Sequence, residues 1–190
     1  MNLVETFLAA DRTITATIAD LPGDPDPVEP VFATESRPRP VPEVLAHLAR
    51  DEAWIPSQLG GETMAEAGRT RFDGDLLGAD PAAAFAGLAA RAQEAAAGIT
   101  DLGAAVHCSF GDCPVEEYLW QVIVARTIGA EALARAGRLS SPVDEELAAA
   151  VLAGLEPRAE LWRAIGILLP ARESASSAAS DRLWGECGLG

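Results

Sequence analysis

The order of apolar and polar positions along the chain predicts a protein built mainly of amphipathic helices. Apolar side chains recur at helical spacing in residues 2–21, in residues 42–59 and in residues 81–97. A proline falls in the first turn of the second and of the third segment, where a helix tolerates it. The first half of the chain is therefore expected to form three helices.

The central segment, residues 115–137, has the longest uninterrupted helical pattern. Its apolar stripe narrows to Ala125, Gly129 and Ala132 over two turns. A glycine inside a helix costs about 1 kcal/mol relative to alanine, so something should compensate for it. Two explanations remain open at this point: a neighbouring helix packs very closely here, or the small residues form the wall of a cavity.

A short β-hairpin is expected just before the central helix. Residues 104–110 and 113–115 have strand-like patterns and flank the turn at Gly111-Asp112. Elsewhere valine and isoleucine are too scattered to build a larger sheet. The sequence thus predicts an all-α fold, a four-helix bundle with a small inserted β-hairpin, in one domain that spans residues 1–190.

The part of the chain after the central helix reads as shorter elements. A capped helix is expected over residues 141–155, and Pro157 is expected to break it and start another. Residues 173–190 are predicted to be a C-terminal linker and short tail, because their first eight residues are of low complexity. One last helical turn at 181–186 would lay Leu183 and Trp184 on the bundle.

The segment between the first two helices, residues 22–40, is predicted to be a loop with a function. It contains six prolines and therefore cannot form regular structure. Loops of this length are uncommon in compact domains unless they have a role, often as lids. We expect this segment to be a loop or lid that covers one mouth of a pocket.

Charge and composition narrow the range of partners. The chain has 29 acidic and 14 basic side chains, for a formal net charge of −15. Such a chain repels phosphate backbones and anionic lipid, which argues against nucleic acid and membranes as partners. No apolar run approaches the about 18 residues of a membrane helix, and the N-terminal segment lacks the pattern of a signal peptide. We therefore expect a cytoplasmic protein.

His47 is the main candidate for chemistry. The chain has only two histidines, and His47 lies on the second helix with Glu43 and Asp51 one turn away on either side. A neighbouring carboxylate can orient an imidazole, so this group could act as a general acid and base. The alternative is a ladder of surface charges. His107, on the hairpin, is interpreted as a structural edge residue.

Cysteines and tryptophans add weaker signals. Cys108 and Cys113 flank the hairpin turn, but an odd number of cysteines in a chain expected in the cytoplasm favours free thiols. Trp54 and Trp120 are candidates for the lining of a cavity, although tryptophans in bundles also fill cores. The chain contains no nucleotide-binding or serine-nucleophile motif.

Over nearly its whole length, the chain resembles the mycothiol-dependent maleylpyruvate isomerase-like branch of the DinB superfamily. The resemblance rests on the stretches VPEVLAHLARDEAWIPSQLGGETMAEAG, RFDGDLLGADP, VHCSFGDCPVEEYLWQ, ALARAG and VDEELAAAVLAGLEPRAELWRAIGILLP. It implies a DinB-like four-helix bundle. It also implies a divalent metal, held by a histidine on the second helix and by an acidic residue and a histidine one turn apart on the central helix. Mycothiol or bacillithiol would be the cosubstrate.

When the family's ligand positions are matched to this sequence, two of the three metal ligands are missing. The first histidine is His47, but the acidic ligand falls at Ala125 and the second histidine at Gly129. The tryptophan–aspartate pair that usually follows reads Glu131-Ala132. One imidazole cannot hold a catalytic metal at ordinary concentrations, so we expect no metal site.

Three hypotheses for function follow. The first is a metal-independent enzyme that isomerises, cyclises or opens a ring in a mostly apolar small molecule of secondary metabolism. In it, His47 is the acid/base, oriented by Glu43 or Asp51. The substrate pocket of this enzyme would be lined by Trp54, Trp120, Ala125, Arg126, Gly129, Glu131 and Ala132. The second is a mycothiol-dependent thiol transferase or isomerase. The third is a non-catalytic small-molecule-binding or self-resistance protein. Monomer and homodimer both remain open.

Overall fold

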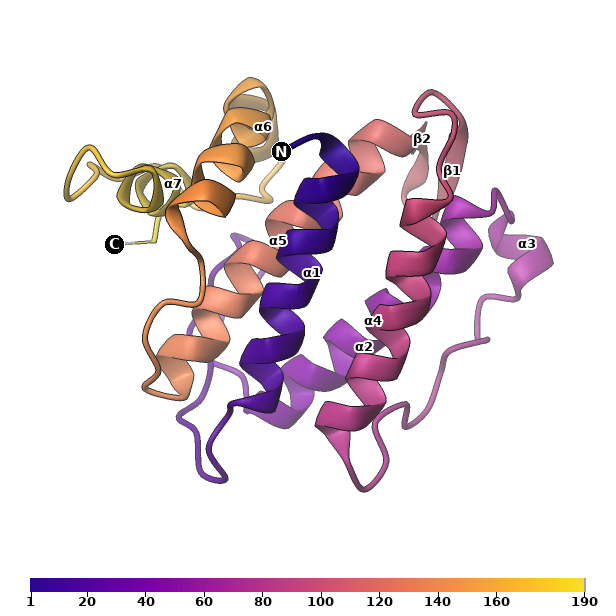
Figure 1. Cartoon of the computed structure of the whole chain (residues 1–190), viewed down its shortest axis with the longest axis horizontal. Coiled ribbons are helices and arrows are strands. Elements are labelled where there is room, and N and C mark those ends of the chain that lie inside the picture. The colour runs from indigo at the N-terminus through magenta and orange to yellow at the C-terminus, as the bar shows by residue number, and fades with distance from the viewer. Residues whose placement is uncertain (190) are drawn as a thin grey trace.

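The protein is mostly helical with one small two-stranded antiparallel sheet, as a computed structural model of the chain shows for residues 1–189 (Figure 1). The helices are α1 (Leu3–Ala19), α2 (Val41–Leu59), α3 (Met64–Ala67), α4 (Pro81–Ala97), α5 (Val115–Ala136), α6 (Glu145–Ala164) and α7 (Ala179–Cys187). The strands are β1 (Ala105–Cys108) and β2 (Gly111–Pro114).

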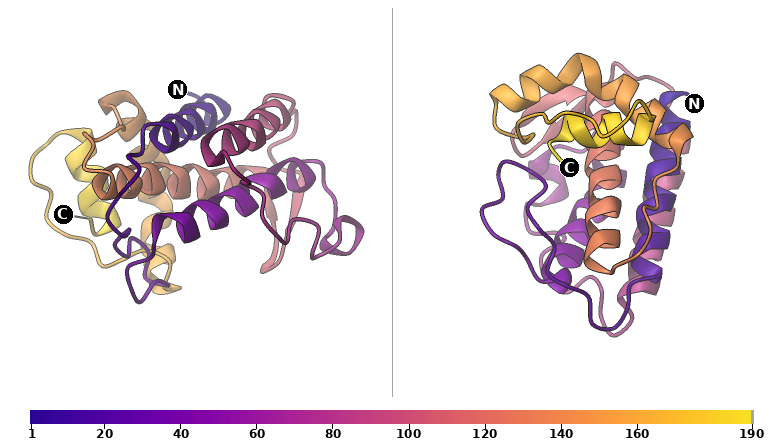
Figure 2. Two further views of the ribbon diagram at one scale, coloured as in Figure 1. Left: turned by 90° about the horizontal axis from the view of Figure 1, so that it is seen from below. Right: turned by 90° about the vertical axis from the view of Figure 1, so that its left-hand side faces the viewer.

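Four long helices form the body of the molecule. Helix α1 packs against both α5 and α4, and α2 packs against α4 and α5, which closes a ring of four (Figure 1). Helices α6 and α7 pack on each other at one side of the molecule, and α6 also contacts α5 and α1 (Figure 2). The predicted helical bundle with an inserted hairpin therefore agrees with the coarse architecture.

Local capping explains where several helices begin. Asn2 and Glu5 form a capping box at the start of α1, in which the Asn2 side chain accepts a hydrogen bond from the Glu5 amide at 2.9 Å. Asp80 caps α4 by accepting a hydrogen bond from the Ala83 amide at 3.1 Å. The helix predicted over residues 81–97 is confirmed at both ends. Its start was predictable because the cap and the proline after it are local signals.

The predicted break at Pro157 is wrong. Helix α6 begins after its cap Asp144 and runs without interruption to Ala164, with Pro157 inside it. A proline inside a helix costs about 3 kcal/mol. Leu155, Ala159 and Trp162 are all buried around it. Burying a large apolar side chain contributes about 1.5–3 kcal/mol, so packing on both sides of the proline offsets the local cost.

The C-terminal helix is longer than the single turn predicted. Helix α7 has nine residues, and it buries Leu183, Trp184 and Cys187 against the rest of the protein. The expectation that Leu183 and Trp184 cover the bundle is confirmed. The segment before α7, predicted as a linker, is mostly exposed.

The predicted hairpin is present, but its turn lies two residues earlier than predicted: β1 ends at Cys108 and β2 begins at Gly111, so the turn is formed by Ser109 and Phe110. His107 pairs with Asp112 across the two strands, and His107 Nδ1 lies 2.9 Å from Asp112 Oδ1. Gly111 has a φ of +132°, a conformation that favours glycine. The cysteines Cys108, Cys113 and Cys187 are free thiols, as predicted. The hairpin ends directly at the start of α5 and so projects its tip beside that helix.

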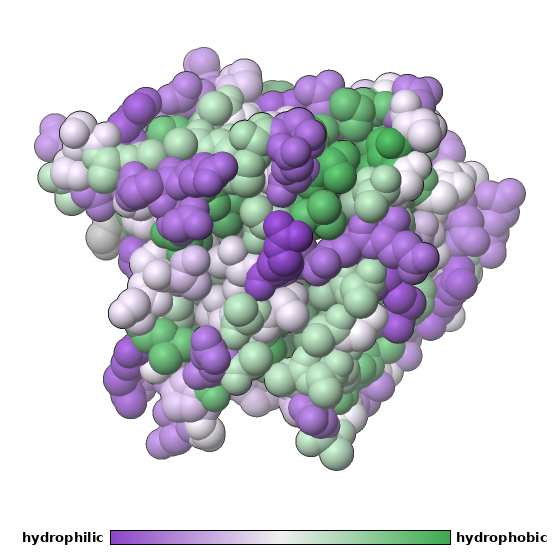
Figure 3. Space-filling model, viewed as in Figure 1, coloured by the Kyte–Doolittle hydropathy of each residue, from purple (hydrophilic) through white to green (hydrophobic). Residues whose placement is uncertain are grey.

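The surface mixes polar and apolar residues. Figure 3 shows hydrophilic residues interspersed with weakly hydrophobic ones over the visible face, with the strongest hydrophobic colour between the start of α1 and the hairpin. No helix within residues 1–189 is long and apolar enough to cross a membrane.

Candidate functional site

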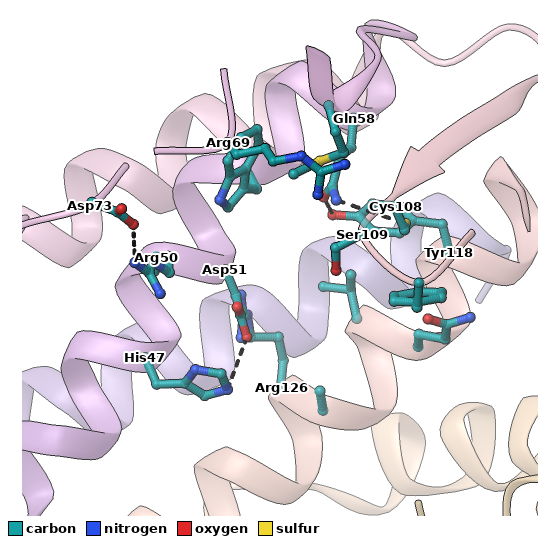
Figure 4. Close-up of a pocket in the computed structure, with 16 residues that line it drawn as sticks. His47, Arg50, Asp51, Gln58, Arg69, Asp73, Cys108, Ser109, Tyr118 and Arg126 are labelled. Atoms are coloured by element: carbon teal, nitrogen blue, oxygen red, sulfur yellow. Dashed lines mark hydrogen bonds and ion pairs between the residues drawn. The ribbon is translucent and has the colours of Figure 1, made fainter. Parts of the chain in front are cut away.

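Two adjoining cavities lie between α2 and α5. The larger has a volume of about 470 Å³ and is also bounded by the α3–α4 connection and the hairpin (Figure 4). The smaller has a volume of about 380 Å³ and is also bounded by residues of the segment 22–40. We call them the large cavity and the small cavity, and together the trough.

The two cavities meet at four side chains. His47 and Asp51 on α2, with Ala125 and Arg126 on α5, line both of them. In Figure 4, His47 and Asp51 lie at one side of the large cavity, and Gln58, Cys108 and Tyr118 lie toward the hairpin. A ligand that spans the trough would therefore pass over His47.

His47 is paired with one of its two predicted partners. His47 Nε2 lies 3.5 Å from Asp51 Oδ2, within ion-pair range, and both side chains are about half exposed, at 57% and 48%. The other predicted partner, Glu43, instead forms an ion pair of 3.6 Å with Arg37. The structure therefore brings His47 and Asp51 together at the junction and turns Glu43 toward the loop that precedes α2.

Below the junction, Arg126 is held by a buried ion pair. Its side chain is 2% exposed, and the Arg126 Nη2 and Nε atoms lie 2.7 and 2.8 Å from Glu52 Oε2. Burial lowers the pKa of Arg126, but the Glu52 carboxylate, with Asp51 and Asp11, more than offsets this and leaves the pKa raised. Arg126 therefore keeps its positive charge at the floor of the trough.

A second buried carboxyl group completes this cluster. Asp11 is fully buried on α1, and its Oδ2 accepts a hydrogen bond of 2.6 Å from Gln93 Nε2. Its Oδ1 and the Oε1 of Glu52 are the only buried side-chain polar atoms within residues 1–189 that lack a hydrogen-bond partner. We infer that Asp11 and Glu52, which we call the acid pair, share one proton, because a proton on one carboxyl group would let it donate to the other and satisfy both oxygens.

The charge balance supports the shared proton. Two carboxylates and one guanidinium would leave a net negative charge in the core, which is costly to bury. Burial first, and then the charge of Glu52, raise the pKa of Asp11 from 3.8 to about 7. With one proton on the acid pair, the cluster of Asp11, Glu52 and Arg126 is electrically neutral.

This polar cluster joins the four helices of the ring, and of its members only Arg126 was predicted from the sequence. Asp11 lies on α1, Glu52 on α2, Gln93 on α4 and Arg126 on α5. A signal existed in the pattern, because Glu52 interrupts an apolar stripe at a position where helical spacing calls for an apolar residue. Asp11 similarly lies three residues before buried Ile14.

The small residues of α5 were expected either to allow close packing of another helix or to form the wall of a cavity, and the structure shows both. A Cβ atom at Gly129 would lie 3.2 Å from Ile14 Cδ1 of α1 and 3.9 Å from Leu48 Cδ2. Helix α1 therefore packs closely on α5 here, and a side chain larger than a methyl group would press on Ile14. Gly129 also lines the small cavity together with Ala125 and Ala132, so the same stripe forms part of a cavity wall.

The three other residues predicted to line the substrate pocket, Trp54, Trp120 and Glu131, lie in different parts of the structure. Trp54 lines the large cavity and packs edge-on against Phe72, with ring centroids 4.9 Å apart. Trp120 instead packs on the backbone of α6 at Gly154, with the Arg158 guanidinium over its ring. Glu131 is buried and accepts hydrogen bonds of 2.8 Å from Arg135 and 2.7 Å from Ser141. Of the three, only Trp54 faces the trough.

The thiols near the large cavity are poor nucleophiles. Burial raises the pKa of Cys108 to about 12, and burial also raises the pKa of Cys113. The Gln58 amide nitrogen donates to Cys108 Sγ at 3.8 Å, while the Tyr118 hydroxyl donates to the Gln58 amide oxygen. Cys108 therefore lines the cavity as a neutral thiol.

The residues at the positions that the resemblance assigns to a metal do not fit a metal ion. His47, Ala125 and Gly129 all line the small cavity, but the last two carry no ligand atom. Within residues 1–189, no three histidine, cysteine or acidic side chains are grouped so that they could hold a metal.

No protein-family model, no curated protein and no solved structure matches this chain.

Proposed function

We propose that the protein is a metal-independent enzyme that isomerises, cyclises or opens a ring in a small molecule held in the trough. The observation that carries this proposal is the position of the His47–Asp51 pair at the junction of the two cavities. An acid/base group placed there can reach a substrate that occupies either cavity.

The chemistry divides among three side chains. His47 removes a proton from one position of the substrate and returns it to another, while Asp51 orients the imidazole and stabilises its protonated form. Arg126 at the floor offers a fixed positive charge to negative charge that develops on the substrate. The acid pair fixes Arg126 from below and so keeps this charge in place during the reaction.

The resemblance to the DinB superfamily supports the same site. The three positions that it assigns to metal ligands surround one cavity. With alanine and glycine at two of them, that cavity has room for substrate where a metal and its ligands would stand. Part of the proline-rich segment, including Val31, Phe32 and Arg39, lines the other side of this cavity, in accordance with a role as a lid.

The test is a substrate search with matched histidine variants. Purified protein is incubated with a mixture of microbial secondary metabolites, and consumed and formed species are followed by mass spectrometry. We expect wild-type protein to convert at least one species to a product of equal mass or of mass increased by one water. His47→Gln should abolish this conversion.

The other histidine provides the control. His107→Gln removes an imidazole that pairs with Asp112 on the hairpin, so it should leave the conversion unchanged. Asp51→Asn should slow the conversion without abolishing it, because it removes the partner of His47 and not the imidazole. Conversion that persists at wild-type rate in His47→Gln contradicts the proposal.

A further inference from the structure

The large cavity contains one positive charge that the protein leaves without a partner. Of its basic and acidic lining groups, Arg50 is paired with Asp73, His47 with Asp51, and Arg126 with Glu52. Arg69 also lines the cavity, and within residues 1–189 no acidic side chain lies in ion-pair range of it. Arg69 is exposed at the cavity, so its guanidinium is free to pair with a bound anion.

The groups beside Arg69 are hydrogen-bond donors that lack strong acceptors. The Gln58 amide nitrogen has only the sulfur of Cys108 as a partner, at 3.8 Å, because the Gln58 oxygen is occupied by Tyr118. Ser109 brings an exposed hydroxyl to the same cavity. Figure 4 shows Arg69 and Gln58 at the end of the cavity away from His47. An acceptor with negative charge would satisfy this end of the cavity.

Aromatic side chains complete the lining. Trp54 forms part of the wall. Phe110, at the hairpin tip, also lines the cavity although its side chain is 71% exposed, the highest value among the large hydrophobic residues of 1–189. An exposed aromatic side chain at the mouth of a cavity is suited to cover the flat face of a ligand.

We propose that the large cavity binds an aromatic carboxylic acid, with its carboxylate on Arg69 and its ring between Trp54 and Phe110. Arg69 can bind a carboxylate through two parallel hydrogen bonds, and the Gln58 amide and Ser109 hydroxyl can donate to the same group. A phosphate, with about two negative charges, would face Asp51 and Asp73 with only one unpaired cation to balance it. This inference rests on the proposed small-molecule function of the trough and names the substrate class.

The test measures binding alone and does not require turnover. trans-Cinnamate and its uncharged amide, trans-cinnamamide, are titrated into the full-length protein at low ionic strength, with binding followed by NMR. We expect cinnamate to bind at least about fivefold more tightly than cinnamamide, since Arg69 is exposed and its charge is partly screened. High salt should reduce this preference.

Variants locate the preference on one residue. Arg69→Gln should bring the ratio of the two affinities close to one, and Arg69→Lys should retain part of it. Arg91→Gln is the matched control, because Arg91 is also an exposed arginine but lies on α4 outside the cavity lining. Circular dichroism of each variant checks that the helices are intact.

Several results would overturn the inference. These are equal binding of acid and amide, no binding of either, an unchanged preference in Arg69→Gln, or tighter binding of phenyl phosphate than of cinnamate. None of them involves His47, so the inference can fail while the His47-dependent conversion is observed. Equally, cinnamate can bind at Arg69 in a protein that catalyses nothing.

Discussion

Asparagine at position 11 should remove a specific part of the pH dependence of stability. Asp11 is proposed to hold a proton that it shares with Glu52. In Asp11→Asn, the amide nitrogen can donate to Glu52 Oε1, and the amide oxygen can still accept from Gln93. The variant thus reproduces the protonated state of the acid pair in a form that does not titrate.

The size of the effect follows from the pKa of Asp11. The pKa rises from 3.8 to about 7 on folding, so between these values the folded state binds more protons than the unfolded state. The contribution of Asp11 to stability is therefore greatest below the lower value and is lost as the pH rises toward about 7. At ~1.4 kcal/mol for each pH unit, the full loss is about 4 kcal/mol, of which about 3 kcal/mol falls between pH 5 and pH 9.

The assay is urea denaturation of wild type and variant from pH 5 to pH 9. The free energy of unfolding of wild type should fall by about 3 kcal/mol more than that of Asp11→Asn over this range. Asp20→Asn, an exposed aspartate just after the same helix, is the control and should follow wild type. Equal pH slopes for wild type and Asp11→Asn would refute the shared proton.

Two further predictions concern packing around α5. Gly129→Leu should destabilise the protein by about 1–3 kcal/mol in chemical denaturation, because its Cβ would already lie 3.2 Å from Ile14. Gly129→Ala should stay within about 1 kcal/mol of wild type, since helix propensity offsets this milder contact. A stabilised Gly129→Leu would show that the cavity, and not α1, lies next to this residue. Gly154→Ala should cost about 2 kcal/mol or more, because a Cβ there would lie 2.0 Å from the Trp120 ring. Adding Trp120→Leu should recover part of that loss, and a double variant no more stable than Gly154→Ala would contradict the contact.

The sequence predicted the elements that depend on local signals. The start of helix α4 was predicted correctly because Asp80 and Pro81 define it without reference to the rest of the chain. The existence of the hairpin was also predicted from a local signal, Gly111, but its turn was misplaced, because Gly111 begins β2 and the turn lies at residues 109–110. Where long-range packing decides, the prediction was wrong: Pro157 stays inside α6 because buried side chains on either side hold the helix together.

The candidate site was predictable only in part. The spacing of His47 and Asp51 on one helix was enough to predict their pairing. It could not show that Glu43 turns to Arg37, because that choice depends on the path of the preceding loop. Nor could it bring Asp11 and Glu52 together, since their contact joins two helices whose relative rotation is set by the whole core.

The sequence alone could not predict that Arg69 lacks an ion-pair partner. Arg69 lies in a loop with several acidic residues nearby in the chain, and these would suggest a partner. In the structure, the Glu66 carboxylate is occupied by Thr63, and the Asp73 carboxylate by Arg50. Only the three-dimensional pairing of the other charges identifies Arg69 as the available cation.

The most direct test of the central claim is conversion of a metabolite by protein that has been treated with a chelator and assayed without added thiol. The account predicts that chelated wild type converts the same species at the same rate as untreated protein, and that chelated His47→Gln converts none. A conversion that requires a returned metal ion or added mycothiol, or that proceeds equally in His47→Gln, would contradict it.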